Sequence, residues 1–355
     1  MEVVDPPGNV DVAEQSRGSR TVLVTRLVIG ALLAVAVITG LALFADVSEL
    51  ATAISAFPLL LVPPILALTL FNYALRYVKW QLYLSRLGLT NVSTNESALV
   101  FLSGFSMSVT PGKVGELVKC LLLRRMTGAP VSRTSAILAA ERVTDGIAML
   151  LLAAVGVLQF SYGRTLLALA ALGALAVTFF LQRPNLAGRV LARFGNFNAG
   201  AKVIRHAESF FEASESLLRP RLLTAAVALG TISWGGECVA LFLVLIGLGI
   251  EPTFQLLLIA VFVLAVSSIA GAISLLPGGL GVADASVAGM LLLLIEDDGM
   301  NRGVAAAATL IIRFATLWFA VLIGAVALGV LQRRLARRPG EIGDETIWDS
   351  KQTTI

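Results

Sequence analysis

The sequence predicts an all-α polytopic membrane protein, and two features of its composition carry that prediction. Hydrophobic residues make up 57% of the 355 residues and charged residues only 14%, against about 45–50% and 25% in ordinary soluble domains. The apolar residues form continuous runs, several near the ~20 residues that a helix needs to cross a ~30 Å hydrocarbon core. This composition excludes a soluble enzyme, a disordered chain and a nucleic-acid-binding domain, so membrane lipids and not nucleic acids are the expected partners.

The apolar runs define a membrane domain, residues 22–331, between a polar N-terminus, residues 1–21, and a polar tail, residues 332–355. The first run is longer than the ~7–15 residues of a signal-peptide core, so we expect it to remain as a span. About six runs are predicted to cross the membrane fully, and the others to form two Pro-Gly-broken helical hairpins. The runs are Val22–Phe44, Phe57 to about Tyr77, Ser97–Thr110, Ser135–Phe160, Thr165–Leu181, Leu222–Gly247, Thr253–Leu276, Val282–Ile295 and Gly303–Leu331.

The charged loops orient these spans, because cytoplasmic loops of membrane proteins carry an excess of Lys and Arg. Arg17 and Arg20 precede the first run, and residues 333–338 contain four arginines. The loop with Asp46 and Glu49 contains no basic residue. We therefore predict a multi-pass protein of the cell membrane with both termini in the cytoplasm. The net charge of +4 reflects basic loops and not a polyanionic partner.

A basic segment, residues 183–220, connects the two halves of the domain on the predicted cytoplasmic side. Its pattern is typical of an amphipathic helix that lies on a membrane surface, and a connector is its expected role. The stripe of moderate polarity is Val203, Ala207, Phe210, Ser214 and Leu217, and the charged face is Lys202, Arg205, Glu208 and Glu212.

A short motif occurs twice and indicates an internal duplication. The first copy is Thr110-Pro111-Gly112-Lys113-Val114-Gly115-Glu116, and the second is Leu276-Pro277-Gly278-Gly279-Leu280-Gly281, with Asp284 just beyond. In each half a later run carries an arginine, Arg142 or Arg313, and the offsets of 166 residues between the prolines and 171 between the arginines nearly agree. The first motif would face the cytoplasm and the second the outside, so the halves, about 57–160 and 222–331, are predicted to be inverted repeats. Chance is the alternative.

The two breaks are predicted to hold an anionic headgroup. Proline suits the first turn of a helix, glycine lets backbones approach closely, and a helix N-terminus points N–H groups and a positive dipole at an anion. The alternative is a pair of packing kinks, with the lysine of the first break at the interface. The candidate binding residues in the breaks are Pro111, Gly112, Lys113, Gly115, Pro277, Gly278, Gly279 and Gly281.

Several charged residues lie inside the predicted spans, where each costs at least ~2.5 kcal/mol at the bilayer centre and usually faces a cavity. Arg142 and Arg313 are predicted to bind a lipid phosphate, which fits the guanidinium fork. Arg142 shares a helix face with Asp145 and can pair with it. Interhelical ion pairs that only hold the bundle, or acidic residues that stabilise a first helical turn, are the alternatives. The candidate coupling or supporting charges are Glu116, Glu141, Asp145, Glu237 and Asp284.

The end of the second run is predicted to lie at the cytoplasmic interface, with Arg76 and Trp80 as anchors. Asn72 either lines a cavity or hydrogen-bonds a neighbouring helix. The two cysteines lie in apolar runs and the single histidine in a polar stretch, so we expect no disulfide, no metal site and no cofactor.

Three motifs in order resemble one family. They are Gly104-x-x-Met107-x-Val109-Thr110-Pro111-Gly112-Lys113-Val114-Gly115-Glu116, then Glu141-Arg142-x-x-Asp145, then Leu276-Pro277-Gly278-Gly279-Leu280-Gly281-x-x-Asp284. This set resembles the flippase-like family, the transmembrane region of lysylphosphatidylglycerol synthases, here as a stand-alone member. The similarity covers about Val22 to Leu331. Asp284 stands where many relatives have Glu, which keeps the charge.

The resemblance implies movement of an amphipathic lipid, such as an aminoacylated phosphatidylglycerol or a polyprenyl-linked glycolipid, between leaflets. The synthases carry a soluble catalytic domain after their membrane part, whereas this sequence ends in a short polar tail, so we expect no enzyme activity. The sequence contains no Walker P-loop, so movement would be passive or coupled to an ion gradient or a partner. The alternative function is a non-transporting scaffold for a separate lipid-modifying synthase or glycosyltransferase.

Overall fold

The computed structural model describes residues 35, 39–41, 43–110, 116–157, 164–183 and 201–336. Every regular element in this part of the chain is helical, which confirms the all-α fold. Most of the first predicted run and both polar termini lie outside the described residues, as does most of the first Pro-Gly motif, residues 111–115.

The α-helices of the described residues are α2 (Val47–Ala56), α3 (Val62–Arg86), α4 (Thr94–Ser103), α5 (Val118–Thr127), α6 (Val131–Val157), α7 (Arg164–Leu181), α9 (Ala201–Leu217), α10 (Pro220–Gly247), α11 (Phe254–Ile273), α12 (Val282–Leu294), α13 (Arg302–Arg313) and α14 (Phe319–Ala336). Most α-helices agree with the predicted runs within a few residues, but α3 begins later and ends well beyond its run, α4 ends before its run does, and α2 and α5 lie outside the predicted runs. Short 3₁₀ turns are η1 (Leu59–Leu61), η2 (Gly104–Met107) and η4 (Pro277–Gly279), and η5 (Phe314–Trp318) is a π-helical turn.

Five segments of the described residues are long and apolar enough to cross a membrane, as a multi-pass membrane protein requires. They are Leu59–Arg86, Pro220–Gly247, Phe254–Ile273, Pro277–Leu294 and Arg302–Leu335. The helix α6, with 27 residues, is also long enough at ~1.5 Å per residue. Its middle, however, carries the charged residues that the sequence places at membrane depth.

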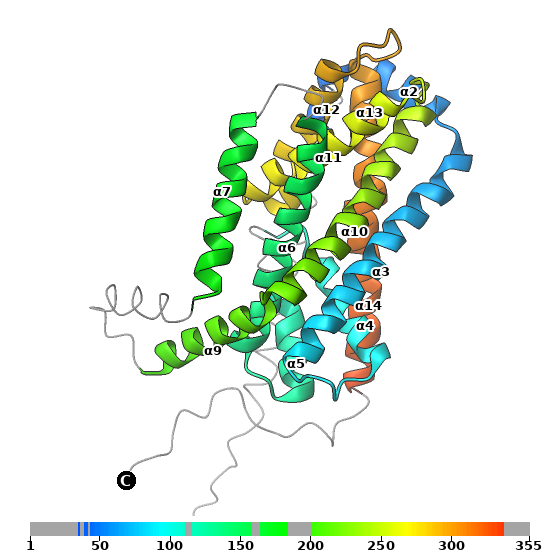
Figure 1. The fold of residues 1–355 in the computed structure, drawn as a ribbon. Coiled ribbons are helices and arrows are strands. Elements are labelled where there is room, and N and C mark those ends of the chain that lie inside the picture. Colours follow the sequence, from blue (N-terminus) through cyan, green and yellow to red (C-terminus); the bar gives the residue numbers. More distant parts are fainter. Residues whose placement is uncertain are drawn as a thin grey trace, which may run out of the picture.

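The two broken hairpins lie at opposite ends of the bundle (Figure 1). The helices α4 and α5 are at the end where the chain also reaches α9, whereas α11 and α12 are at the other end, beside α2 and the start of α13. The long helices α3 and α10 run between these ends, side by side. This placement agrees with inverted halves, although the repeat boundaries remain a prediction.

The second break is a tight turn made possible by three glycines. Gly278, Gly279 and Gly281 have φ angles of 61°, 67° and 84°, a region that residues with a β-carbon rarely adopt. A β-carbon on Gly279 would lie only 3.1 Å from Cα of Gly271, so the turn packs directly on the backbone of α11. Pro277 lies in a first helical turn, as predicted, but that turn is the short η4, and α12 begins only at Val282 after the positive φ angles.

Two hydrophobic clusters fill the bundle, and most of the intramembrane charges lie between them. One cluster joins α2, α11, α12 and α13 to the start of α3, and the other joins α4, α6, α9 and α14 to the end of α3. Along α3, Ile65 belongs to the first cluster and Trp80 to the second. The polar residues Thr69 and Asn72 lie between these two positions of α3, and both are fully buried.

The helix α9 is amphipathic, as predicted, whereas its position on the cytoplasmic membrane surface stays a prediction. It packs along α6, with Ser214 and Leu217 fully buried, and leaves Arg205, Glu208 and Glu212 exposed. It runs obliquely across one end of the bundle (Figure 1). The side chains of residues 201–203 lie outside the described part.

Candidate functional site

The site begins with α3, which is longer than the sequence predicted. The helix continues to Arg86, nine residues beyond the expected end at Tyr77, so Arg76 lies about 15 Å from its C-terminal end. The interpretation of Arg76 and Trp80 as interfacial anchors is therefore wrong. Trp80 is fully buried, and its indole N–H donates to Ser97 Oγ at 3.1 Å.

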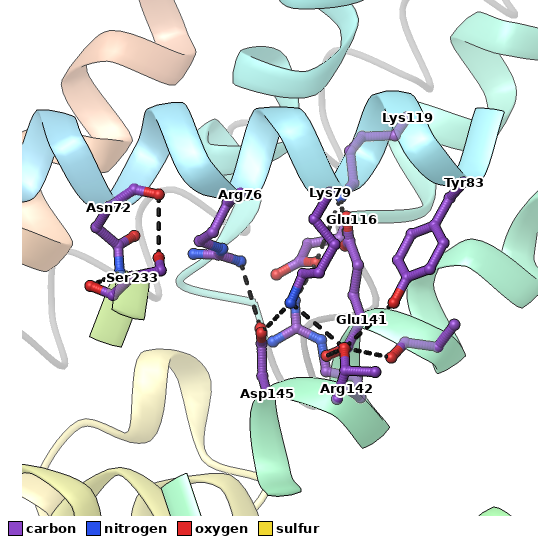
Figure 2. Close-up of polar contacts among 12 residues, drawn as sticks. Asn72, Arg76, Lys79, Tyr83, Glu116, Lys119, Glu141, Arg142, Asp145 and Ser233 are labelled. Carbon is purple, nitrogen blue, oxygen red and sulfur yellow. Dashed lines mark hydrogen bonds and ion pairs between the residues drawn. The ribbon is translucent and has the colours of Figure 1, made fainter. Parts of the chain in front are cut away.

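One face of α3 carries four polar side chains, at spacings of four, three and four residues: Asn72, Arg76, Lys79 and Tyr83. Figure 2 shows them turned toward α6 and α10. The buried Lys79 ammonium donates to the Asp145 carboxylate of α6 and also lies 3.3 Å from Thr144 Oγ1. A buried charge is stable only with such a partner, so this pair fixes α3 against α6.

A second set of charges joins α5 to α6 (Figure 2). Lys119 Nζ lies 2.9 Å from Glu141 and 4.0 Å from Glu116, and Arg142 Nη2 donates to Glu116 at 2.7 Å. The expected pairing of Arg142 with Asp145 is replaced by these contacts, because α3 supplies cations to Asp145. The ion pairs form two groups, which together we call the charged belt: Arg76, Lys79 and Asp145 in one, and Glu116, Lys119, Glu141 and Arg142 in the other.

The second half contains a corresponding pair just after its own break. Arg313, the last residue of α13, lies 2.5 Å from Asp284 Oδ1, and the other Asp284 oxygen accepts the Gly281 N–H at 2.8 Å. Asp284 thus stabilises the first turn of α12, as one alternative predicted. Binding of an anionic guest at the α12 N-terminus stays a prediction, and within the structure the Asp284 carboxylate already accepts the N–H of the N-cap residue Gly281 there.

The helix α10 closes the site from a third side. Asn72 Nδ2 donates to the Ser233 carbonyl and Ser233 Oγ donates to the Asn72 carbonyl, both at 3.1 Å. Asn72 therefore bonds a neighbouring helix, one of its two predicted roles. Glu237 follows Ser233 by one turn and is buried, as expected for a charge at this depth.

The predicted break residues divide into two groups. Pro277, Gly278, Gly279 and Gly281 shape the turn before α12 and hold its backbone, and Pro111, Gly112, Lys113 and Gly115 lie outside the described residues. The sequence analysis missed Lys79, Lys119 and the inward position of Arg76. A signal was available, since Val78, Trp80 and Leu82 continue the apolar run past the charges.

The helical bundle with charges at membrane depth defines a polytopic membrane protein. The chain belongs to the family described as lysylphosphatidylglycerol synthase TM region, which matches residues 31–324. It is 28% identical over 238 residues to a UPF0104 membrane protein of Methanothermobacter thermautotrophicus, covering 60% of this chain and 68% of the relative. A second match, also to a UPF0104 membrane protein of that organism, is 33% identical over 98 residues, and spans 28% of this chain and 27% of the relative.

Proposed function

We propose that this protein moves an amphipathic lipid with an anionic headgroup between the two leaflets of the cell membrane. The lipid class is an anionic or aminoacylated phospholipid or a polyprenyl-linked glycolipid, and the movement involves no covalent step. We propose that both termini lie in the cytoplasm, and the distribution of basic residues supports this orientation.

One observation carries the proposal: the accessible charges at membrane depth are cationic, and the carboxylates are shielded. The side chains of Arg142 and Arg313 are 35% and 20% exposed, whereas those of Asp145, Glu116, Glu141 and Asp284 are 9%, 7%, 3% and 2% exposed. A headgroup that reaches these residues meets guanidinium groups first. Arginine binds phosphate through its planar fork, so an anionic headgroup is the favoured ligand.

The placement of the two Arg–carboxylate pairs supports movement rather than static binding. Each pair joins a carboxylate beyond a Pro-Gly break to an arginine of a later helix, and the two broken hairpins lie at opposite ends of the bundle (Figure 1). Opposed broken helices around a central site are the arrangement that many secondary transporters use for alternating access. Glu141, Asp145 and Glu237 are the protonatable groups that we propose for coupling to an ion gradient.

The test is the exchange of a fluorescent phosphatidylglycerol between leaflets of proteoliposomes, read by dithionite quenching. Arg142→Gln should reduce the exchange to the rate of protein-free vesicles. Arg125→Gln is the matched control, because Arg125 is an exposed arginine of α5 outside the charged belt. An Arg142→Gln protein that elutes as a single species and exchanges lipid at the wild-type rate would contradict the proposal.

A scaffold for a separate lipid-modifying enzyme is the second candidate, and the density of ion pairs favours it. Lys119–Glu141 joins α5 to α6 and Arg313–Asp284 joins α12 to α13, so these charges also hold helices together. A scaffold should lose stability in Arg142→Gln without any exchange in the wild type. If neither phosphatidylglycerol nor a polyprenyl-phosphate sugar exchanges in wild-type vesicles, the scaffold is the better account.

A further inference from the structure

Besides Arg142, the structure contains a second partly exposed arginine at this depth, and its N–H donors are not used in hydrogen bonds with the described residues. Arg76 lies on the inner face of α3, with its side chain 14% exposed. Its nearest charged partner is Asp145, and the Nη2–Oδ2 distance of 3.9 Å is too long for a hydrogen bond. None of its five N–H groups donates a hydrogen bond to any described residue.

Aromatic rings hold the Arg76 guanidinium in place. Its Cζ atom lies 5.4 Å from the centroid of Phe105 and 5.8 Å from the centroid of Trp234. Cation–π contacts of this kind orient a guanidinium without consuming its N–H donors. Arg142 and Arg313 differ, because each donates to a carboxylate at 2.7 Å or less. Arg76 is therefore the arginine of the three that is held by aromatic rings and not by a hydrogen bond to a carboxylate, although Arg313 also keeps an unused donor, Nη2.

Three further polar atoms around Arg76 are buried without a hydrogen-bond partner among the described residues. They are the donor Trp234 Nε1 and the acceptors Asn72 Oδ1 and Asp145 Oδ2. Asn72 is fully buried and Asp145 is 6% exposed. Asn72 precedes Arg76 by one helical turn and bonds Ser233, the chain neighbour of Trp234, and Figure 2 shows Asn72 and Arg76 on the face of α3 turned toward Ser233 and Asp145. Buried polar atoms in native structures normally have partners, and three unpartnered ones on residues that contact or adjoin Arg76 indicate a missing ligand.

We propose that Arg76, Trp234, Asn72 and Asp145 bind a lipid headgroup that carries a phosphodiester together with a hydroxyl or ammonium group. The phosphate oxygens accept from Arg76 and the Trp234 indole, and the hydroxyl or ammonium donates to Asn72 Oδ1 and Asp145 Oδ2. This headgroup site rests on the proposed function and names its recognition chemistry. A bare phosphate satisfies only the donors, and a quaternary ammonium has no N–H for the acceptors.

The experiment measures binding of short-chain lipids to the purified full-length protein in detergent, by equilibrium dialysis. The probes are dihexanoyl phosphatidylglycerol, dihexanoyl phosphatidylethanolamine, dihexanoyl phosphatidic acid and inorganic phosphate. Arg76→Gln should weaken phosphatidylglycerol binding by about 10–100-fold, the value expected for lost hydrogen bonds to a charged group. Arg86→Gln, at the exposed end of the same helix, is the charge-matched control and should bind as the wild type does.

Three further variants separate the roles within the site. Trp234→Phe keeps the ring over Arg76 but removes the N–H donor, and should weaken the phosphate-containing probes alike. Asn72→Ala should reduce the preference for phosphatidylglycerol over phosphatidic acid. Arg125→Gln, an exposed arginine of α5 outside the charged belt, should leave binding within about twofold. Lys79 still neutralises Asp145 in Arg76→Gln, so that variant should fold, which a single elution peak would confirm.

Equal affinity of folded Arg76→Gln and wild type for phosphatidylglycerol would overturn the headgroup site. Failure of the wild type to bind any lipid probe would also overturn it, as would tighter binding of inorganic phosphate than of the lipids. The proposed function fails separately: binding that depends on Arg76 without leaflet exchange would retain the site and reject transport. Exchange that is unchanged in Arg76→Gln would retain transport and reject the site.

Discussion

Both halves of the molecule pair a carboxylate with an arginine at membrane depth, but they use different numbers of charges. In the second half, Asp284 and Arg313 form one ion pair, and the carboxylate also caps α12. In the first half, the corresponding Glu116–Arg142 pair is one of the ion pairs in the seven-residue charged belt. A single ion pair is enough to hold the helices of a hairpin together. The additional cations of the first half are not needed for that purpose, which is why we place headgroup binding there.

Substitution of Asp145 should have the largest effect, because both Arg76 and Lys79 pair with this carboxylate. Asp145→Ala leaves Lys79 buried without its carboxylate and removes the nearest anion from Arg76. Removing one partner of a buried ion pair costs about 3–5 kcal/mol. Thermal unfolding in detergent should show a large loss of stability. The double variant Lys79→Met/Asp145→Leu should recover most of it, and an equally unstable double variant would contradict this account.

Replacing the arginine of each ion pair, Arg313 or Arg142, should destabilise the two halves to different extents. Arg313→Gln leaves Asp284 with the Gly281 N–H but no ion pair, so we expect a loss of about 1.5–3 kcal/mol in the free energy of unfolding. Arg142→Gln should cost less, about 1 kcal/mol, because Lys119 lies 4.0 Å from Glu116 and can still neutralise it. Chemical unfolding of both variants in the same detergent makes the comparison. A larger loss of stability in Arg142→Gln than in Arg313→Gln would mean that Lys119 does not neutralise Glu116 when Arg142 is removed.

The turn of the second break offers a smaller test. Gly278 has a φ of 61° and lies against Leu317, so Gly278→Ala should destabilise the protein by about 1–2 kcal/mol. Gly289→Ala is the control in the helix that follows, because its position has open space and ordinary helical geometry. That control should be neutral or slightly stabilising. Equal unfolding midpoints for the two variants would show that the positive φ does not constrain the hairpin.

Much of this architecture could be predicted from the sequence, because it depends on local patterns. The length of the apolar runs identifies the helices, and the Pro-Gly motifs locate the second break within a few residues. The role of Asp284 at a first helical turn follows from its position just beyond the glycines. These features depend on neighbours in the chain, which a single sequence displays.

The partners of the charges could not be predicted, because they come from helices far apart in the sequence. Spacing alone favours Arg142 with Asp145, whereas packing brings Lys79 from α3 to Asp145 across 66 residues. The charge on Arg76 also suggested the end of a span, although α3 continues beyond this residue to Arg86. At membrane depth a cation is stable wherever a carboxylate meets it, so charge alone does not mark an interface.

The most direct test of the central claim compares two lipids in the same wild-type proteoliposomes. The claim is that accessible cations beside shielded carboxylates select an anionic headgroup for movement between leaflets. Fluorescent phosphatidylglycerol should exchange at least about tenfold faster than fluorescent phosphatidylcholine, which corresponds to one lost charge-assisted contact. Equal rates for the two lipids, or rates no faster than those of protein-free vesicles, would contradict the claim.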